Sequence, residues 1–314
     1  MNKISCKVFT LLALVATLIS ACEKENAEVK FYQPVTKVGQ AIFAASEVHR
    51  VYTDTTFLVA PGVEETDVHF QCMSGYIVRA WVIRASLNTP GLQLRVSVPD
   101  GAKDYYQSVQ TLSEMADTYS APAGRVAAMI NGDFWDTGML VPRGPIHCSG
   151  NILNQVFNYD ERLSQQALSY VAVKNDGTML IDSKDSYIDN QDYLKEVTGA
   201  GVLLVKNGSI PAIPASWTAR DPRTAIGYDK DGGYVYFLVA DGRQDFWSYG
   251  LSYSELSSIF MSLGCEQAAN LDGGGSAQLL IRHPVARIWQ IRNSPSDGVE
   301  RAVFNGWMIT VDEP

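Results

Sequence analysis

Short apolar runs separated by glycine-containing turns constrain the fold of this chain more than any other feature of its sequence. Strand-length runs flank Asn175-Asp176-Gly177 and Asp231-Gly232-Gly233, and a third run leads into Asn207-Gly208. Asn-Gly, Asp-Gly and Gly-Gly pairs readily adopt the positive φ that tight turns between antiparallel strands require. Because such hairpin patterns outnumber strand–helix–strand patterns, we predict an α+β fold with a mixed, largely antiparallel sheet or sheets, flanked by a few helices.

Two helices are predicted from capping boxes, in which a Ser or Thr and the Glu three residues later bind the first free amides of a helix. Thr111 and Glu114 form one such pair, and Ser252 and Glu255 form the other. Gly264 is suited to end the second helix. Further strands are expected from apolar and β-branched runs at residues 76–85, 91–98, 125–130, 277–281 and 302–311.

The N-terminus has the pattern of an export signal. Lys3 and Lys7 precede an apolar run at residues 8–19, which is too short to cross a bilayer as a helix. The run ends in Ile19-Ser20-Ala21-Cys22, which resembles a bacterial lipobox with Cys22 as the residue to be acylated. Acylation by several chains would give stable membrane anchoring. A plain secretory signal followed by an incidental Cys is the alternative.

These features predict three parts: a lipoprotein signal peptide at residues 1–21, a polar tether at residues 22–40, and one domain at residues 41–314. A domain boundary near residue 105 is the alternative. The protein is expected to be exported and anchored to the bacterial envelope, at the periplasmic face or the cell surface. The membrane is then a partner through Cys22.

Charge and cysteine content exclude several classes of protein. The chain has 25 Lys and Arg against 34 Asp and Glu, a net charge of -9, whereas binding to a nucleic-acid backbone needs a basic face. We therefore expect no nucleic-acid partner. Cys72, Cys148 and Cys265 are an odd number at wide spacing, which fits neither a disulfide framework nor a zinc site. Each is expected to be a small buried hydrophobic residue.

Four segments place polar residues and glycines at the ends of strand-like runs, where binding and catalytic side chains gather on a rigid scaffold. Residues 131–136 (NGDFWD) leave Asp133 at the exit of a strand. Arg223 begins a strand and is suited to holding an anion by two hydrogen bonds. Residues 239–243 (VADGR) end another apolar strand. Taken singly, each of these three also fits an ordinary turn or a surface arginine.

The glycine triplet at residues 273–275 is the sharpest of the four signals. Three glycines between two strand-like runs cost backbone entropy. They are understandable where backbone amides must approach a ligand, forming an anion-binding nest beside Asp272. Asn270 and Asp272 would share one face of an extended segment. A flexible glycine loop is the alternative.

Several common enzyme patterns are missing from the sequence, namely the His-Glu-x-x-His zinc site, the Walker loop, the dinucleotide-binding glycine pattern and the Gly-x-Ser-x-Gly elbow. No cofactor is required by the residues that remain, although clustered acids also suit a divalent cation such as Ca²⁺ or Mg²⁺. These residues form a site of carboxylates, arginines and backbone amides: Asp133, Asp241 and Asp272 with Arg223, Arg243 and Arg301.

In their order along the chain, these segments resemble the phosphodiester glycosidase family, here as a bacterial lipoprotein member. The resemblance extends from about residue 57 to the C-terminus. Trp135 stands where a second Phe is common in the family. The matching motifs are NGDFW at 131–135, RTAIG at 223–227, DGR at 241–243, GLSYSEL at 250–256, NLDGGGS at 270–276 and SPSDGVERAVFN at 294–305.

The resemblance implies a hydrolase that cleaves a sugar-1-phosphodiester of an envelope or extracellular glycan, releasing free sugar and a phosphomonoester. Cleavage increases the negative charge on the phosphate, which Arg223 and the glycine amides would neutralise. Asp272, and after it Asp133, is expected to activate water or attack the anomeric carbon. Asp241 is expected to orient Arg243 or a hydroxyl group. The residues expected to bind substrate and phosphate are Asn131, Gly132, Arg223, Gly242, Arg243, Asn270, Gly273, Gly274, Gly275, Ser276 and Arg301.

Two other functions use the same residues. One is a glycan-binding surface lipoprotein without turnover, in which tryptophans supply stacking surfaces. The other is a phosphoesterase that cuts the P–O bond instead of the C–O bond. The tryptophans available for stacking are Trp81, Trp135, Trp217, Trp247 and Trp289.

Overall fold

The computed structural model describes residues 31–119 and 126–312, and the described residues from Gln33 onward form one compact unit. The predicted signal peptide and Cys22 lie outside the described residues. Strands from both sides of residue 105 pair with each other, because β4 (Leu92–Ser97) lies beside β19 (Gly306–Val311).

Helix α2 (Lys37–Ala44) begins inside the range that the sequence assigns to a tether. The Thr36 hydroxyl caps the helix by accepting a hydrogen bond from the Gly39 amide at 2.9 Å. The Asp54 carboxylate accepts one from the Thr36 amide at 2.6 Å. The ordered domain therefore starts before residue 41, and the predicted boundary is several residues too late.

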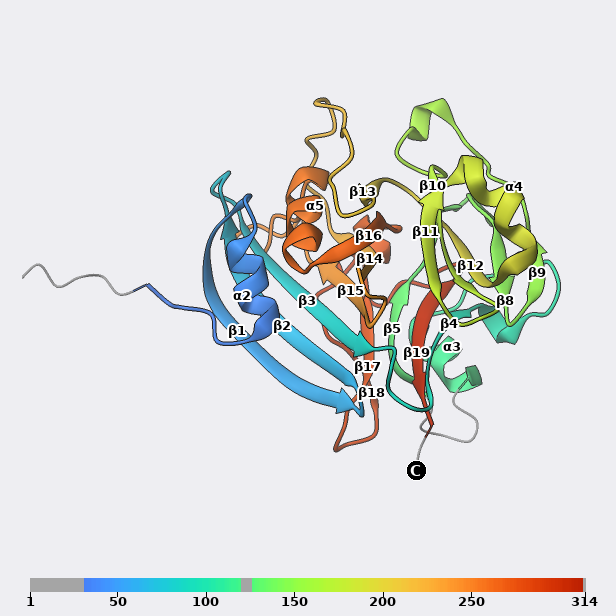
Figure 1. Cartoon of the computed structure of the whole chain (residues 1–314), viewed down its shortest axis with the longest axis horizontal. Helices are drawn as coiled ribbons and strands as arrows, with labels where there is room; N and C mark the ends of the chain where they lie inside the picture. The colour runs from blue at the N-terminus through green and yellow to red at the C-terminus, as the bar shows by residue number, and fades with distance from the viewer. Residues whose placement is uncertain (1–30, 120–125, 313–314) are drawn as a thin grey trace, which may run out of the picture. The chain divides into compact units, whose positions relative to one another are not determined.

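The largest sheet has seven strands, and its order runs from a long N-terminal hairpin to a short edge strand (Figure 1). All of its pairings are antiparallel. In order across the sheet, its strands are β1 (Val48–Ala60), β2 (Val63–Cys72), β3 (Ile77–Ser86), β15 (Tyr234–Ala240), β14 (Arg223–Asp229), β16 (Cys265–Asn270) and β13 (Leu203–Val205).

Two five-stranded sheets and a two-stranded ribbon complete the strands, again with antiparallel pairing. The first has the order β11 (Met179–Ser183), β10 (Ser169–Lys174), β12 (Leu194–Ala200), β8 (Ile146–Cys148) and β9 (Asn151–Asn154). The second has the order β18 (Trp289–Ile291), β17 (Leu279–Arg282), β5 (Val126–Asn131), β19 and β4, and the ribbon pairs β6 (Trp135–Asp136) with β7 (Val141–Pro142).

The helices are few and short. The α-helices after α2 are α3 (Leu112–Tyr119), α4 (Tyr187–Asn190) and α5 (Tyr253–Ser262). Single 3₁₀ turns occur at Pro99–Gly101, Glu161–Leu163, Lys184–Ser186, Gln191–Tyr193 and Gly274–Ser276. Both predicted capping boxes are formed, with Thr111 paired to Glu114 and Ser252 paired to Glu255. The α+β prediction is confirmed.

Two of the three predicted hairpins are formed, and the third is not. The turns at Asn175-Asp176-Gly177 and Asp231-Gly232-Gly233 join β10 to β11 and β14 to β15, as expected. The turn at Asn207-Gly208 closes only one bridge, from Lys206 to Ser209, because β13 pairs with β16 instead. The β1–β2 hairpin was not predicted.

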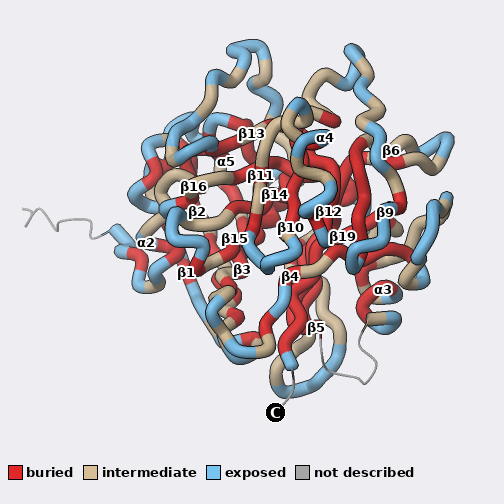
Figure 2. The backbone as a smooth tube through the Cα atoms, turned by 45° about the vertical axis from the view of Figure 1, so that its right-hand side comes forward, coloured by how far each residue is buried: buried red, intermediate tan, exposed pale blue. Residues whose placement is uncertain are grey.

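The core lies on both faces of the seven-stranded sheet. Figure 2 shows that the strands are largely buried and that many of the connecting loops are exposed. One face packs against the two five-stranded sheets, and the other is covered by α2 and α5. Alternate residues of a strand serve the two faces, as with Phe237 and Leu238 of β15. Buried Trp307 of β19 donates from its indole nitrogen to the Thr198 hydroxyl at 2.8 Å, so the two five-stranded sheets are also linked by a polar contact.

The three cysteines of the described domain lie in the core. Cys72, Cys148 and Cys265 are free and buried, which confirms their expected role as small core residues.

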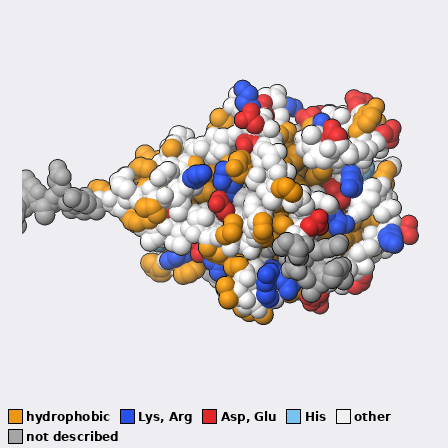
Figure 3. Space-filling model, turned by 60° about the horizontal axis from the view of Figure 1, so that its bottom comes forward, with side chains coloured by type: hydrophobic (Ala, Val, Ile, Leu, Met, Phe, Trp, Pro, Cys, Tyr) orange, Lys and Arg blue, Asp and Glu red, His pale blue; other side chains and the backbone are white. Residues whose placement is uncertain are grey.

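Charged side chains of both signs lie among hydrophobic ones on the face that Figure 3 shows. Within residues 31–119 and 126–312, no helix is both long enough and apolar enough to span a membrane.

Candidate functional site

The four candidate segments converge where neighbouring strands of the seven-stranded sheet begin or end. We call this line of strand ends, which runs across the strands, the edge of the sheet. The start of β14 lies beside the end of β15, with Arg223 opposite Ala240, and beside the end of β16, with Ala225 opposite Asn270. The Asp272 amide donates to the Gly132 carbonyl at 2.9 Å, which joins the end of β16 to the end of β5 in the neighbouring sheet. Antiparallel pairing therefore gathers segments that are far apart in the sequence.

Asp272 is a partly exposed acidic residue of this edge. Its Oδ1 accepts the Gly273 amide at 2.8 Å, and the Ser276 hydroxyl also donates to the carboxylate. Burial raises the pKa of Asp272 to about 6, although these hydrogen bonds and the charges of Arg301 and Arg243 act in the opposite direction. At neutral pH the side chain is therefore ionised, and the charges of Arg301 and Arg243 stabilise its ionised form.

Asp133 lies behind this carboxylate and is 2% exposed. Its Oδ2 accepts the Gly144 amide at 2.6 Å, and its Oδ1 accepts its neighbour's amide, that of Phe134, at 2.8 Å. The backbone of Gly199 packs so closely that a Cβ there would lie 2.5 Å from Oδ2. Burial raises the pKa of Asp133 to about 8, with the negative charge of Asp272 adding to the rise. Asp133 is thus held by backbone groups and sealed from solvent.

Asp241 is also buried, at 1% exposure, and both of its oxygens are bound. The Trp247 indole donates to Oδ2 at 2.7 Å, while the Ser294 amide and the Asn293 side chain donate to Oδ1 at 3.0 and 3.1 Å. The expectation that Asp241 orients Arg243 is wrong. Arg243 instead donates to Asp221 Oδ1 from Nε at 3.0 Å and from Nη2 at 2.9 Å.

Among the three candidate arginines, Arg223 is buried, and two of its donors bind backbone carbonyls. Its Nε donates to Leu251 and its Nη2 to Ala219, both at 2.9 Å, and Asp221 lies 3.5 Å away. The Arg243 side chain is 55% exposed, whereas Arg301 is bound by Asp297 at 2.7 Å and reaches the Ser276 hydroxyl at 3.3 Å. Arg243 and Arg301 are the arginines whose charges act on Asp272.

The glycine triplet serves a different purpose from the predicted amide nest. The Gly273 amide donates to Asp272, and the Gly274 amide donates to the Pro222 carbonyl at 3.0 Å, so two of the three amides are already bound. A Cβ at Gly274 would lie 3.1 Å from the Arg243 guanidinium, and a Cβ at Gly275 would overlap that of Arg301. Gly274 also has a φ of 59°. Gly274 and Gly275 therefore make room for two arginines against the backbone, whereas Gly273 approaches the Pro222 carbonyl.

The other candidate residues hydrogen-bond to, or pack closely against, neighbouring groups of the site. Asn131 accepts the Thr224 hydroxyl at 2.7 Å and donates to the Asp272 carbonyl at 2.7 Å, so it fixes the backbone of Asp272. The Asn270 side chain is buried and donates to the Leu271 carbonyl at 2.6 Å. A Cβ at Gly132 would overlap the Asn305 side chain, and one at Gly242 would lie 2.5 Å from the Pro222 nitrogen.

Sequence reasoning missed Asp221 and Asn305. Asp221 contacts both Arg243 and Arg223, and the Asn305 Oδ1 accepts the Asp133 amide at 2.8 Å. Both stand in segments already singled out, beside Arg223 and at the end of the last motif. An acid two residues before a candidate arginine is the signal that could have identified Asp221.

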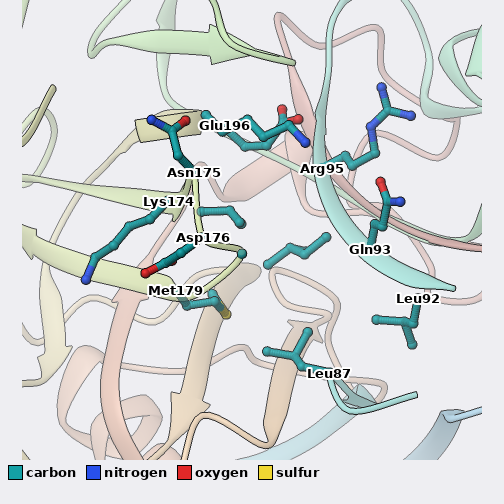
Figure 4. Close-up of a pocket in the computed structure, with 13 residues that line it drawn as sticks. Leu87, Leu92, Gln93, Arg95, Lys174, Asn175, Asp176, Met179 and Glu196 are labelled. Carbon is teal, nitrogen blue, oxygen red and sulfur yellow. The ribbon is translucent and has the colours of Figure 1, made fainter. Parts of the chain in front are cut away.

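A separate cavity of about 290 Å³ lies between β4, β12 and the β10–β11 turn (Figure 4). Leu87, Leu92 and Met179 line one side, and Glu196 lies at the other. The candidate site residues that the structure describes are not among those lining it. Within the described residues, no group of three or more His, Cys, Asp or Glu side chains is placed to hold a metal ion.

An ionised carboxylate beside two arginine charges is an arrangement that can bind an anionic group. The chain belongs to the phosphodiester glycosidase family, whose model matches residues 124–310, more than half of the chain. That range contains all four segments and the six sequence motifs. The family is one of hydrolases that act on phosphodiester-linked sugars.

Comparison with individual proteins agrees with this family. The chain is 36% identical over 118 residues to the Bacillus subtilis prophage-derived protein YomE, which covers 36% of this chain and 17% of YomE. It is 27% identical over 159 residues to human N-acetylglucosamine-1-phosphodiester alpha-N-acetylglucosaminidase, which covers 44% of this chain and 30% of the human protein. The chain thus spans less than a third of the length of either relative.

The fold is similar to that of the zebrafish N-acetylglucosamine-1-phosphodiester alpha-N-acetylglucosaminidase catalytic domain, which is described as auto-inhibited by its pro-peptide. The TM-score is 0.60 at 19% identity, over 91% of this chain and 96% of the zebrafish chain. At this identity the likeness concerns the fold alone.

Proposed function

We propose that this protein hydrolyses a sugar-1-phosphodiester of an envelope or extracellular glycan, releasing free sugar and a phosphomonoester. The observation that carries the proposal is Asp272, a partly exposed residue whose ionised carboxylate is stabilised by the charges of Arg243 and Arg301. A carboxylate alone would repel a phosphodiester, so the two cations account for its binding beside Asp272.

In the proposed reaction, the bond between the anomeric carbon and the phosphate oxygen breaks, and its electron pair stays on the phosphate. The phosphate thereby gains negative charge, and Arg243 and Arg301 stabilise that charge more strongly in the transition state than in the bound substrate. Because a phosphate leaves more readily than an alcohol, the reaction depends less on a strong general acid than ordinary glycoside hydrolysis does.

Asp272 is the residue that we expect to act at the anomeric carbon. It removes a proton from the attacking water, or attacks the carbon itself, and the configuration of the released sugar distinguishes the two routes. Asp133 and Asp241 act as positioning residues in this scheme, because protein donors bind both oxygens of each. Arg223 likewise holds the Ala219 and Leu251 carbonyls beside the site.

Hydrolysis in ¹⁸O-labelled water tests the bond that is cut. The substrates are the methyl phosphodiester of N-acetylglucosamine-1-phosphate and, as a surrogate, UDP-N-acetylglucosamine. We expect the label at the anomeric hydroxyl of the released sugar, measured by mass spectrometry. Label in the phosphate would instead establish a phosphoesterase, and binding without release of sugar would indicate a glycan-binding protein.

We also propose that the protein acts while anchored to the bacterial envelope through acylated Cys22. The support is the lipobox-like sequence at residues 19–22. We expect the full chain to partition into the detergent phase on phase separation, and Cys22→Ser to retain its leader and to carry no lipid mass. A wild-type protein found without lipid in the aqueous phase would contradict the anchor and leave the proposed reaction untouched.

A further inference from the structure

A hollow lined by aromatic side chains lies outside the residues assigned to the reaction. It has a volume of about 400 Å³ and is formed by Ser74, Gly75, Tyr76, Ile77, Phe246 and Tyr249, which we call the aromatic hollow. Tyr76 and Tyr249 contact each other with ring centroids 5.2 Å apart. Tyr76 is 43% exposed and Phe246 is 90% exposed. Two aromatic side chains of the hollow are thus exposed to solvent rather than packed in the core.

The aromatic hollow is at the same edge of the seven-stranded sheet as Asp272. Because β3 runs antiparallel to β15, the start of β3 at Ile77 lies beside the end of β15, and the Asp241 amide donates to the Arg79 carbonyl at 3.1 Å (Figure 1). The Tyr249 amide donates to the Ile77 carbonyl at 3.0 Å. From β3 to β16 there are three strand intervals, or roughly 14 Å at the usual spacing.

One loop connects the two places. After β15 it carries Arg243, which lies against Gly274 and bonds to Asp221. It then carries Phe246 at the hollow and Trp247, whose indole is bound to Asp241. A ligand that follows this loop would contact the arginines at one end and the aromatic rings at the other.

Phe246 adopts a conformation that its burial does not explain. Its φ is 62°, in the left-handed region that is unfavourable for a bulky residue. A side chain that is 90% exposed gains almost nothing from the hydrophobic effect in return. Phe246 stands in a tight turn closed by backbone hydrogen bonds between Gln244 and Ser248, and this turn places its exposed side chain among the residues that line the hollow.

The chemistry of the hollow suits a sugar. Sugar rings have apolar C–H faces that stack on aromatic rings and a rim of hydroxyl groups that needs polar partners. Polar groups are at hand, because the Arg220 guanidinium lies 4.4 Å from the Tyr76 ring centroid and donates to the Ser74 hydroxyl at 2.6 Å. Arg220 also donates to the Gly250 carbonyl at 3.1 Å, so its guanidinium is held in place beside the ring.

We propose that the aromatic hollow binds sugar residues of the glycan attached to the phosphate, a short distance from the bond that is cut. This inference rests on the proposed function, because it assigns a polymeric or oligosaccharide substrate to the same site. The distance of roughly 14 Å along the sheet edge requires a ligand of several sugar residues to occupy both places. The protein therefore prefers substrates with a glycan chain on the phosphate to those with a small alcohol.

Two probes test this preference, both containing N-acetylglucosamine-1-phosphate. In the short probe the phosphate is esterified to methanol, and in the long probe to a primary hydroxyl of a linear glucan tetrasaccharide. The variant is Phe246→Gly, and the matched control is Tyr193→Ala, which removes an exposed aromatic residue outside the hollow. We expect Phe246→Gly to lower the ratio of kcat/KM for the long probe to that for the short probe by roughly five- to tenfold. The control should leave the ratio unchanged.

Stability separates this result from damage to the fold. Glycine relieves the positive φ at position 246, so Phe246→Gly should melt at or above the temperature of the wild-type protein. An unchanged ratio in a folded variant, or an equal fall of the ratio in the control, would overturn the proposal.

A binding measurement keeps this inference distinct from the proposed reaction. Calorimetry with the tetrasaccharide phosphomonoester should show binding to the Asp272→Asn variant. Adding Phe246→Gly to that variant should weaken this binding by roughly five- to tenfold as well. If neither probe is hydrolysed by the wild-type protein but this binding is seen, the hydrolase proposal fails and the aromatic hollow stands. Turnover of both probes with no such binding overturns the aromatic hollow alone.

Discussion

Replacing Asp272 with asparagine is expected to lower kcat for a sugar-1-phosphodiester by roughly 10²- to 10⁴-fold. Asparagine has the same shape, and its amide oxygen still accepts the Gly273 amide that now bonds to Oδ1. The variant loses the negative charge and the ability to take a proton or attack the anomeric carbon. Because Arg243 and Arg301 remain, the KM should change much less than kcat.

The measurement is release of reducing sugar from the methyl phosphodiester, beside circular dichroism to check folding. Asp189→Asn is the matched control, because it makes the same chemical change at an exposed residue of α4. It should keep wild-type turnover. An Asp272→Asn protein that folds normally and retains near-normal kcat would remove Asp272 from the chemistry.

The pH dependence of the wild-type reaction follows from the same residue. A carboxylate that acts as base or nucleophile must be ionised, and the pKa of Asp272 is raised to about 6. The kcat/KM should therefore be low below that value and rise with pH through it. Ionisation of Asp133, with a pKa of about 8, adds a negative charge near the phosphate, so the rate should fall again above that pH. A flat profile between pH 5 and 7 would contradict this assignment.

Local sequence patterns predicted the parts of the fold that depend on local interactions. The capping box at Ser252 and the turn at Asp231-Gly232-Gly233 involve residues three or four apart, and both formed as expected. The candidate segments also met at one place, because each lies at a strand end and antiparallel pairing brings those ends together. This much follows from periodicity and turn chemistry.

The roles of the individual side chains depended on distant partners and were harder to predict. Asp133 and Asp272 look alike in sequence, each at the end of an apolar strand, but Gly144 and Gly199 seal the first and leave the second partly exposed. The glycine triplet signalled a close approach correctly, yet the approaching groups are guanidiniums. Such distinctions arise from packing between sheets, which a single sequence does not encode locally.

The β1–β2 hairpin, which was not predicted, supports the site through a buried ion pair. Glu65 of β2 is 0% exposed, and Arg292 donates from Nε to both of its oxygens at 2.8 Å. Arg292 also reaches Asp67 at 3.1 Å. The next residues, Asn293 and Ser294, donate to Asp241. The ion pair thus fixes the segment that holds Asp241 in place.

Arg292→Ala is expected to lower the free energy of unfolding by about 1–3 kcal/mol at neutral pH, because it leaves the buried Glu65 carboxyl group without the donor that both of its oxygens accept. Burial already raises the pKa of Glu65 to about 8. Without Arg292 that pKa rises further. Above about pH 8, where Glu65 of the wild-type protein ionises beside Arg292, the variant must keep a proton that the unfolded chain has released, so its deficit in stability grows with pH. Urea unfolding at pH 7 and pH 9.5 should therefore show the larger deficit at pH 9.5.

The double variant Glu65→Gln/Arg292→Met separates the ion pair from simple loss of packing. Removing both charges while keeping most of the volume should recover much of the stability, because the cost in the single variant comes from the unpaired buried carboxylate. It should also remove the dependence of the deficit on pH. If the double variant were as unstable as Arg292→Ala at both pH values, the side-chain packing of Arg292 over Phe57, and not its charge, would be what secures the segment beside Asp241.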